Sequence, residues 1–139
     1  RKPRAVSRLN RKSFREMTEK QKRQLVYNKY GGKCAYCGCD LNGKFHKDHF
    51  EPIRRNIGKS GSMNPEREVI ENYMPACASC NINKHSMSLE EFRRLIQGFM
   101  KHLNEVNTQY KVAKRYGLFT ENIKPVEFYF EKYEKDNDN

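Results

Sequence analysis

The stretch KCAYCGCDLNGKFHKDHFEP, residues 33–52, brings two kinds of metal-binding side chain together. Cys34 and Cys37 form a CxxC pair, and Asp48 and His49 follow as neighbours. Thiolates favour a closed structural zinc site, whereas a carboxylate beside an imidazole suits an open site for a harder divalent ion. The stretch therefore predicts one half of each of two different sites, and the other halves must come from elsewhere in the chain.

A second CxxC pair, Cys77 and Cys80, follows with 39 residues between the pairs. Two such pairs supply four thiolates, which is the tetrahedral ligand set of a structural zinc. Because metal binding is coupled to folding, zinc would stabilise a chain with only 36% apolar residues. Two disulfides, a redox dithiol or a single rubredoxin-like iron are the alternatives, although no export signal supports disulfides and a redox protein needs only one pair. We interpret Cys39 as a bystander thiol.

The net charge of +11 is concentrated near the start of the 139-residue chain. Residues 1–33 carry twelve Lys/Arg and two Asp/Glu, residues 34–80 carry six of each, and residues 81–139 carry ten and nine. Lys and Arg neutralise phosphates and release counterions, so this basic arm indicates polyanion binding, with a merely solvated tail as the alternative. The arm residues that we assign to nucleic-acid binding are Arg4, Arg8, Arg11 and Lys12.

The length favours one domain, and no apolar run approaches the roughly 18 residues that a membrane span requires. The start of the chain shows no signal-peptide pattern, and we expect a cytoplasmic protein with no membrane partner. Since the chain begins with Arg1 rather than Met, we expect a fragment or a processed form.

The first half of the chain contains several local structure patterns. Capping-box patterns at Ser13 and Thr18 predict a helix that begins at one of them. Residues 33–50 alternate turns with extended pieces, which we interpret as a hairpin. A polar loop punctuated by Gly and Pro covers 52–68, and a helix is expected over 79–85.

The second half is expected to be mostly helical. Ser88 and Glu91 form another capping box, and apolar residues then recur at helical spacing as far as Leu103. We interpret this apolar stripe as core packing. A further helix is expected over 105–116, and the alternation of apolar and polar residues over 126–130 predicts a half-buried strand.

A second, open site is predicted beside the zinc. The zinc would bring Asp48 and His49 close to Asn81 and His85, which share one helix face at i and i+4. A carboxylate, an amide oxygen and an imidazole suit a catalytic divalent ion. Adjacent side chains on a regular strand face opposite sides. Either the strand is bulged or ends at Asp48 and His49, or His49 reaches the reacting water from the other side of the phosphate.

The order of these motifs resembles the HNH endonucleases, which are ββα-metal nucleases. The matching stretches are CAYCG, KDHFEPI, ENYMPACASCNINKH and SLEEFRRLI, within about residues 20–100. The resemblance implies an α+β fold with a ββα-metal core held by a zinc bound to four cysteines. Flanking helices and a C-terminal strand would complete this fold.

The resemblance also implies a role for each matching position. His49 would be the general base that activates water, and Asn72 would brace the loop that carries it. Asp48 and Asn81 would hold a catalytic Mg²⁺ or Mn²⁺, with His85 as a further ligand. This chemistry is physically sound, because a neutral imidazole can accept a proton near pH 7 and a divalent ion offsets charge at the phosphate.

We predict a basic arm over 1–17, a nuclease core over 18–104 and a C-terminal helix and strand over 105–139. The expected function is hydrolysis of double-stranded DNA by a restriction or phage-type enzyme in a bacterial or phage-infected cell, where a homodimer or two successive nicks would cut both strands. A non-catalytic zinc-stabilised nucleic-acid-binding module is the main alternative, and a zinc-dependent protein-interaction domain is the other. The core side chains expected to contact phosphate are Arg54, Arg55 and Lys84.

Overall fold

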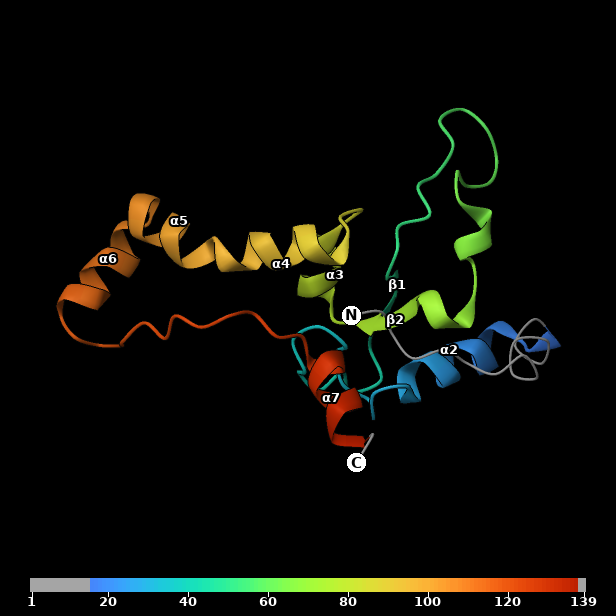
Figure 1. Ribbon diagram of the computed structural model, residues 1–139, viewed down its shortest axis with the longest axis horizontal. Helices are drawn as coiled ribbons and strands as arrows, with labels where there is room; N and C mark the ends of the chain where they lie inside the picture. The colour runs from blue at the N-terminus through green and yellow to red at the C-terminus, as the bar shows by residue number, and fades with distance from the viewer. Residues whose placement is uncertain (1–15, 138–139) are drawn as a thin grey trace. The chain divides into compact units, whose positions relative to one another are not determined.

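The computed structural model describes residues 16–137, and its α-helices and strands are labelled in Figure 1. The described residues up to Leu89, together with those from Glu127 onward, form one compact unit, and Glu90–Val126 form a second. Four residues of the predicted nucleic-acid-binding arm lie outside the described residues: Arg4, Arg8, Arg11 and Lys12. The segment boundaries expected from the sequence stay a prediction.

The first unit holds a small sheet, three helices and two 3-10 turns. Its elements are α2 (Glu19–Asn28), β1 (His46–His49), η1 (Pro65–Arg67), η2 (Ile70–Asn72), β2 (Tyr73–Ala76), α3 (Ala78–Lys84) and α7 (Tyr129–Asn137). The remaining helices are α4 (Leu89–Gln97), which leads into the second unit, α5 (Phe99–Val106) and α6 (Thr108–Arg115). Within the described part of the chain, no helix combines the length and apolar character needed to cross a bilayer.

Helix α2 begins at the second of the two predicted capping boxes. The Thr18 hydroxyl accepts a hydrogen bond from the Gln21 N–H at 3.2 Å, and the Gln21 side chain accepts one from the Thr18 N–H at 2.9 Å. The helix buries Val26 in a small apolar cluster with Ile70. Local hydrogen-bonding chemistry thus decides where this helix starts.

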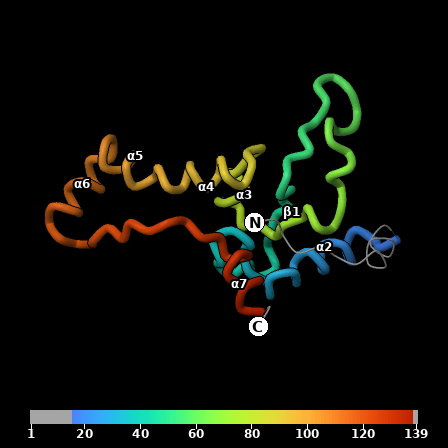
Figure 2. The backbone as a smooth tube through the Cα atoms, in the orientation of Figure 1, coloured from blue at the N-terminus to red at the C-terminus, as the bar shows by residue number. Residues whose placement is uncertain are grey.

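The sheet differs from the hairpin expected over residues 33–50. Strand β1 pairs antiparallel with β2, with His46 opposite Ala76 and His49 opposite Tyr73. The polar loop leaves the sheet after β1 and returns through η1 and η2 to β2 (Figure 2). Part of the hairpin prediction holds, because an antiparallel bridge between Lys33 and Asp40 closes the cysteine-bearing turn, residues 34–39. The pairing of β1 within residues 33–50 was wrong, because the backbone groups of the turn bond within the turn and to β2. Within that turn Ala35 donates its N–H to the Pro75 carbonyl at 2.8 Å, so the turn lies beside β2.

Helix α3 packs against β1, and β1, β2 and α3 together form the predicted ββα arrangement. The mixed α and β fold class is therefore confirmed. The predicted helix over 79–85 is present as α3, but it begins inside the second cysteine pair, with Cys77 as its N-cap.

The predicted strand over 126–130 is instead the approach to helix α7. Phe128 and Phe130 are both buried, which explains the alternating pattern, but the helix already begins at Tyr129. The N–H groups of Tyr129 and Phe130 donate to the Tyr36 and Ala35 carbonyls at 2.9 and 2.8 Å. A helix start leaves its first N–H groups without helical partners, and the cysteine-bearing turn supplies these partners here.

The long apolar stripe after Ser88 is divided into α4 and α5, because the regular helix is interrupted at Gly98. Glycine weakens a helix interior, which explains the break. In the second unit, Asn107 caps α6 by accepting a hydrogen bond from the Tyr110 N–H at 2.8 Å. Asn104 and Tyr110 donate to the Glu121 carboxylate at 2.6 and 2.9 Å, which ties the segment after α6 back to α5 and α6.

Candidate functional site

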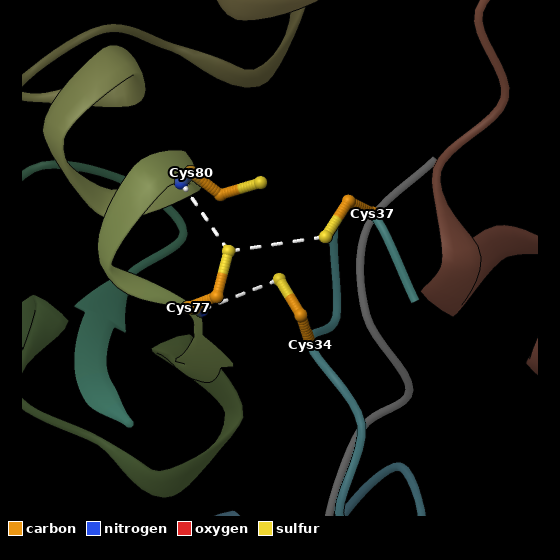
Figure 3. Close-up of side chains that lie close together, drawn as sticks. All are labelled: Cys34, Cys37, Cys77 and Cys80. Carbon is orange, nitrogen blue, oxygen red and sulfur yellow. Dashed lines mark hydrogen bonds between the residues drawn. The ribbon is translucent and has the colours of Figure 1, made fainter. Parts of the chain in front are cut away.

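The four paired cysteines converge on one point (Figure 3). The sulfur atoms of Cys34, Cys37, Cys77 and Cys80 all lie within 4.8 Å of one another. Tetrahedral zinc with Zn–S bonds of about 2.3 Å separates its sulfur ligands by about 3.8 Å. The Cys37 and Cys77 Sγ atoms are 3.8 Å apart. The cluster is therefore positioned to bind a metal and is consistent with a structural zinc.

The surroundings of the cluster favour the thiolate form of Cys34 in particular, whereas burial raises the pKa of Cys37 and the hydrogen bond with Cys34 raises the pKa of Cys80. The Cys77 N–H donates to the Cys34 Sγ at 3.4 Å, and the Cys80 N–H donates to the Cys77 Sγ at 3.4 Å. Hydrogen bonds from the Cys80 thiol and from backbone N–H groups lower the pKa of Cys34 to about 4. Since the thiolate is the form that binds metal, this environment prepares Cys34 as a ligand. Cys39 is exposed and does not belong to the four-cysteine group.

Asp48 is buried and held by two partners. Its Oδ2 accepts a hydrogen bond from the Tyr36 hydroxyl at 2.5 Å and lies 3.1 Å from the Lys84 Nζ. Burial raises the pKa of Asp48 above its ordinary value, although the Lys84 ammonium and the Tyr36 hydroxyl act in the opposite direction. Oδ2 is thus bonded within the protein, and no hydrogen bond or ion pair to Oδ1 is found among the described residues.

Lys84 has a different position from the one expected. Its side chain is 0% exposed, and besides Asp48 its ammonium donates to the His49 carbonyl at 2.9 Å. This corrects the expectation that Lys84 contacts phosphate, because a fully buried ammonium paired with a carboxylate is not available to DNA. The ammonium instead joins α3 to two consecutive residues of β1.

His49 points to a group that the sequence reasoning did not include. Its Nε2 lies 3.2 Å from Oε1 of Glu68, whose other oxygen accepts a hydrogen bond from the Tyr73 hydroxyl. The imidazole also lies against the Tyr73 ring, with ring centroids 5.0 Å apart. The His49 side chain is 23% exposed, so solvent reaches it.

Strand β1 is regular, with consecutive register from His46 to His49. The Asp48 side chain contacts Tyr36 and Lys84, whereas the His49 side chain contacts Glu68 and Tyr73, so the two side chains have separate partners. The register shows no bulge, and β1 ends at His49. The direction from which His49 would approach a reacting water stays a prediction.

Asn72 is buried at the end of η2 and hydrogen-bonds to the chain just beyond β1. Its Oδ1 accepts from the Glu51 N–H at 2.7 Å, and its Nδ2 donates to the Glu51 and Arg67 carbonyls, each at 2.9 Å. Three hydrogen bonds therefore fasten together the two ends of the loop that follows His49.

The two remaining candidate ligands lie on and just after α3. Asn81 precedes Lys84 by three residues and so lies on the helix face from which Lys84 reaches β1. Its side chain is half-buried, and no side-chain hydrogen bond to Asn81 is found among the described residues. His85 is exposed and ends the helix with φ of +47°, so it does not continue the regular face.

The loop between the strands exposes basic side chains. Arg54 and Arg55 are exposed, as is Lys59 near the tip. A backbone bridge between Arg55 and Ser62 joins the two sides of the loop. These side chains are accessible to a polyanion, unlike Lys84.

One known family matches part of the chain. Residues 34–87 match the HNH endonuclease family model. The matched segment runs from the first cysteine of the cluster to just past α3, and it contains both strands. HNH endonucleases act on DNA, so the match indicates a nuclease-type function for this HNH segment. Searches of curated proteins and of solved structures found no match.

Sequence reasoning missed Glu68 and gave Lys84 another role. Glu68 was included in a polar loop, and Lys84 was expected to contact phosphate at the surface. The sequence gives no sign of the role of Glu68, because it lies 19 residues from His49 and that separation predicts nothing by itself. Lys84 shares a helix face with Asn81, which could have suggested that both face the strand.

Proposed function

We propose that the HNH segment hydrolyses phosphodiester bonds in double-stranded DNA, with His49 as general base and a divalent ion held by Asp48 and Asn81. The observation that carries this proposal is that a side chain of helix α3 holds strand β1 in place. The Lys84 ammonium holds the Asp48 carboxylate and the His49 carbonyl from α3, the helix that bears Asn81 and Cys80 and has Cys77 as its N-cap.

The donor set suits a hard divalent ion. Asp48 offers the oxygen that Lys84 and Tyr36 do not occupy, and Asn81 offers an amide oxygen. Two protein oxygens completed by water and substrate match the preference of Mg²⁺ or Mn²⁺. An ion bound there would offset negative charge on the phosphate and the leaving oxygen. His85, exposed and outside the regular helix, is a weaker candidate ligand.

The other site residues would act on the water and the loop. His49 is partly accessible and would accept a proton from the attacking water. Asn72 would keep the chain after His49 in place through its three hydrogen bonds. Tyr36 would orient the Asp48 carboxylate through its hydroxyl.

DNA would be held by charge. The exposed Arg54 and Arg55 on the loop would contact phosphates, with the basic arm adding affinity that falls steeply with salt. A restriction or phage-type role in a bacterial or phage-infected cell, with cleavage by a homodimer or by successive nicks, completes the proposal. A non-catalytic nucleic-acid-binding module remains the second candidate, because the basic loop and a structural zinc would suffice for it.

The deciding experiment is relaxation of supercoiled plasmid with Mg²⁺ or Mn²⁺. His49→Ala is compared with His46→Ala, a matched control because His46 is an exposed histidine on the same strand. We expect wild type and His46→Ala to cut, and His49→Ala and EDTA-treated wild type to be inactive. If all proteins bind DNA in a gel shift and none cuts with any metal tested, the binding-module function replaces the nuclease.

A further inference from the structure

We infer that Glu68, held by Tyr73, sets the hydrogen-bonding state of His49, so that the Nε2 nitrogen carries the proton and the Nδ1 nitrogen faces the water. This inference rests on the proposed function for the role of Nδ1, but the geometry of the three side chains stands by itself.

The sheet register places two of the three groups together. His49 and Tyr73 are directly opposed across β1 and β2, so their side chains lie on the same face of the sheet. Their rings are in contact, with an angle of 48° between planes. Glu68 bridges them, because one carboxylate oxygen meets the His49 Nε2 and the other accepts from the Tyr73 hydroxyl.

The loop backbone presents Glu68 at this point. Glu68 directly follows the 3-10 turn η1, and its own N–H donates to the Pro65 carbonyl at 3.1 Å. The preceding residue, Arg67, is fixed from both sides. Its guanidinium donates to the Pro52 carbonyl at 2.7 Å, and its carbonyl accepts from the Asn72 side chain at 2.9 Å. Asn72 therefore helps to position Glu68 as well as the chain after His49.

The chemistry of the carboxylate selects one tautomer. An ionised glutamate can only accept hydrogen bonds, so the imidazole nitrogen that faces it must carry the proton. In a neutral histidine the other nitrogen, Nδ1, is then the acceptor. A carboxylate behind an imidazole also stabilises the positive charge that appears when the histidine takes a proton, as in other histidine–carboxylate pairs.

Tyr73 keeps the carboxylate in place. Burial and the Glu68 carboxylate raise the pKa of Tyr73 above its ordinary value, so the phenol stays protonated and remains a donor. Glu68 is a positioning residue in this arrangement: it acts on the reaction through His49.

The test measures the histidine directly. Protein labelled with ¹⁵N-histidine is examined by long-range ¹H–¹⁵N NMR, which reports which ring nitrogen carries the proton. The chain has four histidines, and His49→Ala assigns the resonance of interest. The test variant is Glu68→Ala, with Glu66→Gln as the control, because Glu66 is a solvent-exposed carboxylate on the same loop.

A free neutral histidine already favours Nε2–H, so we expect this form to be exclusive in wild type and in Glu66→Gln, and a measurable Nδ1–H population to appear in Glu68→Ala. In the cleavage assay, Glu68→Ala should lower kcat about 10- to 100-fold with little change in KM. Glu68→Asp should be more active than Glu68→Ala but less active than wild type, and it should retain part of the preference for the Nε2–H form. A role limited to fastening the loop would leave the tautomer unchanged.

The outcomes separate this inference from the proposed function. An unchanged His49 tautomer in Glu68→Ala overturns the inference, even if wild type cuts DNA and His49→Ala does not. An Nδ1–H population that appears only in Glu68→Ala supports control of His49 by Glu68 even if wild type proves inactive, in which case the nuclease function alone fails. An Nδ1–H form in wild type also overturns the inference.

Discussion

Replacing Lys84 by methionine should destabilise the protein strongly. Methionine keeps an apolar chain of similar size but removes an ammonium that lies 3.1 Å from the Asp48 Oδ2 and 2.9 Å from the His49 oxygen. At an effective dielectric constant of about 20 the pair attracts by about 5 kcal/mol, before the cost of removing both charges from water. Breaking a buried pair by removing one partner costs about 3–5 kcal/mol, because the other charge is left unpaired.

Urea unfolding at pH 7 with saturating zinc measures this loss. The same substitution in an Asp48→Asn background should cost at least about 2 kcal/mol less, since no unpaired carboxylate remains. Equal losses from Lys84→Met in both backgrounds would refute the reasoning, because the two groups would then be energetically independent.

The pH dependence provides a second check on the same variant. Without Lys84, the pKa of buried Asp48 in the folded state should rise further above its unfolded value. The folded state then binds more protons than the unfolded state, so stability rises as pH falls through the folded-state pKa. The deficit of Lys84→Met should therefore be smaller at pH 5 than at pH 7.

Three further results are expected. Removing the metal with a strong chelator, or replacing Cys80 by serine, should unfold the first unit, as followed by circular dichroism, and colourless protein as purified would exclude iron. Burial lowers the pKa of Lys29 to about 8, so the unfolded state binds more protons than the folded state between pH 8 and 10. The free energy of unfolding of wild type, relative to that of Lys29→Met, should therefore rise by about 2 kcal/mol between pH 7.5 and 9.5 in urea unfolding. Gly38→Ala should cost about 2 kcal/mol in the same assay, because φ is +79° and the new Cβ would lie 2.9 Å from Tyr129, whereas Gly43→Ala, with φ of +78° and open space, should cost only about 1 kcal/mol.

The parts of the fold that sequence predicted well depend on nearby residues. The start of α2 follows from the reciprocal hydrogen bonds of Thr18 and Gln21, which are three residues apart. The two CxxC pairs indicated one cluster because four thiolates at this spacing have few other uses, and the structure brings all four within 4.8 Å. The ββα arrangement followed from the resemblance that these pairs and the Asp-His motif support.

The errors came from interactions between distant residues. Strand β1 had a nearby segment as its expected partner, but Tyr73–Ala76 pairs with it. The alternation over 126–130 resembled a strand because Phe128 and Phe130 both enter the core, while the backbone forms the start of α7. A period of two describes which side chains are buried, and it does not by itself show that the backbone pairs with another strand.

The sequence by itself determined the residue types of the site and the starts of α2 and α4, because capping and metal-ligand spacing act over a few residues. Only the tertiary structure decided that Lys84 is buried against Asp48 and that Glu68 meets His49. Lysine and glutamate are usually found at the surface, and their burial or pairing depends on where the chain brings an opposite charge. That position is set by the pairing of β1 with β2 and by the packing of α3 on β1, which join segments far apart in the sequence.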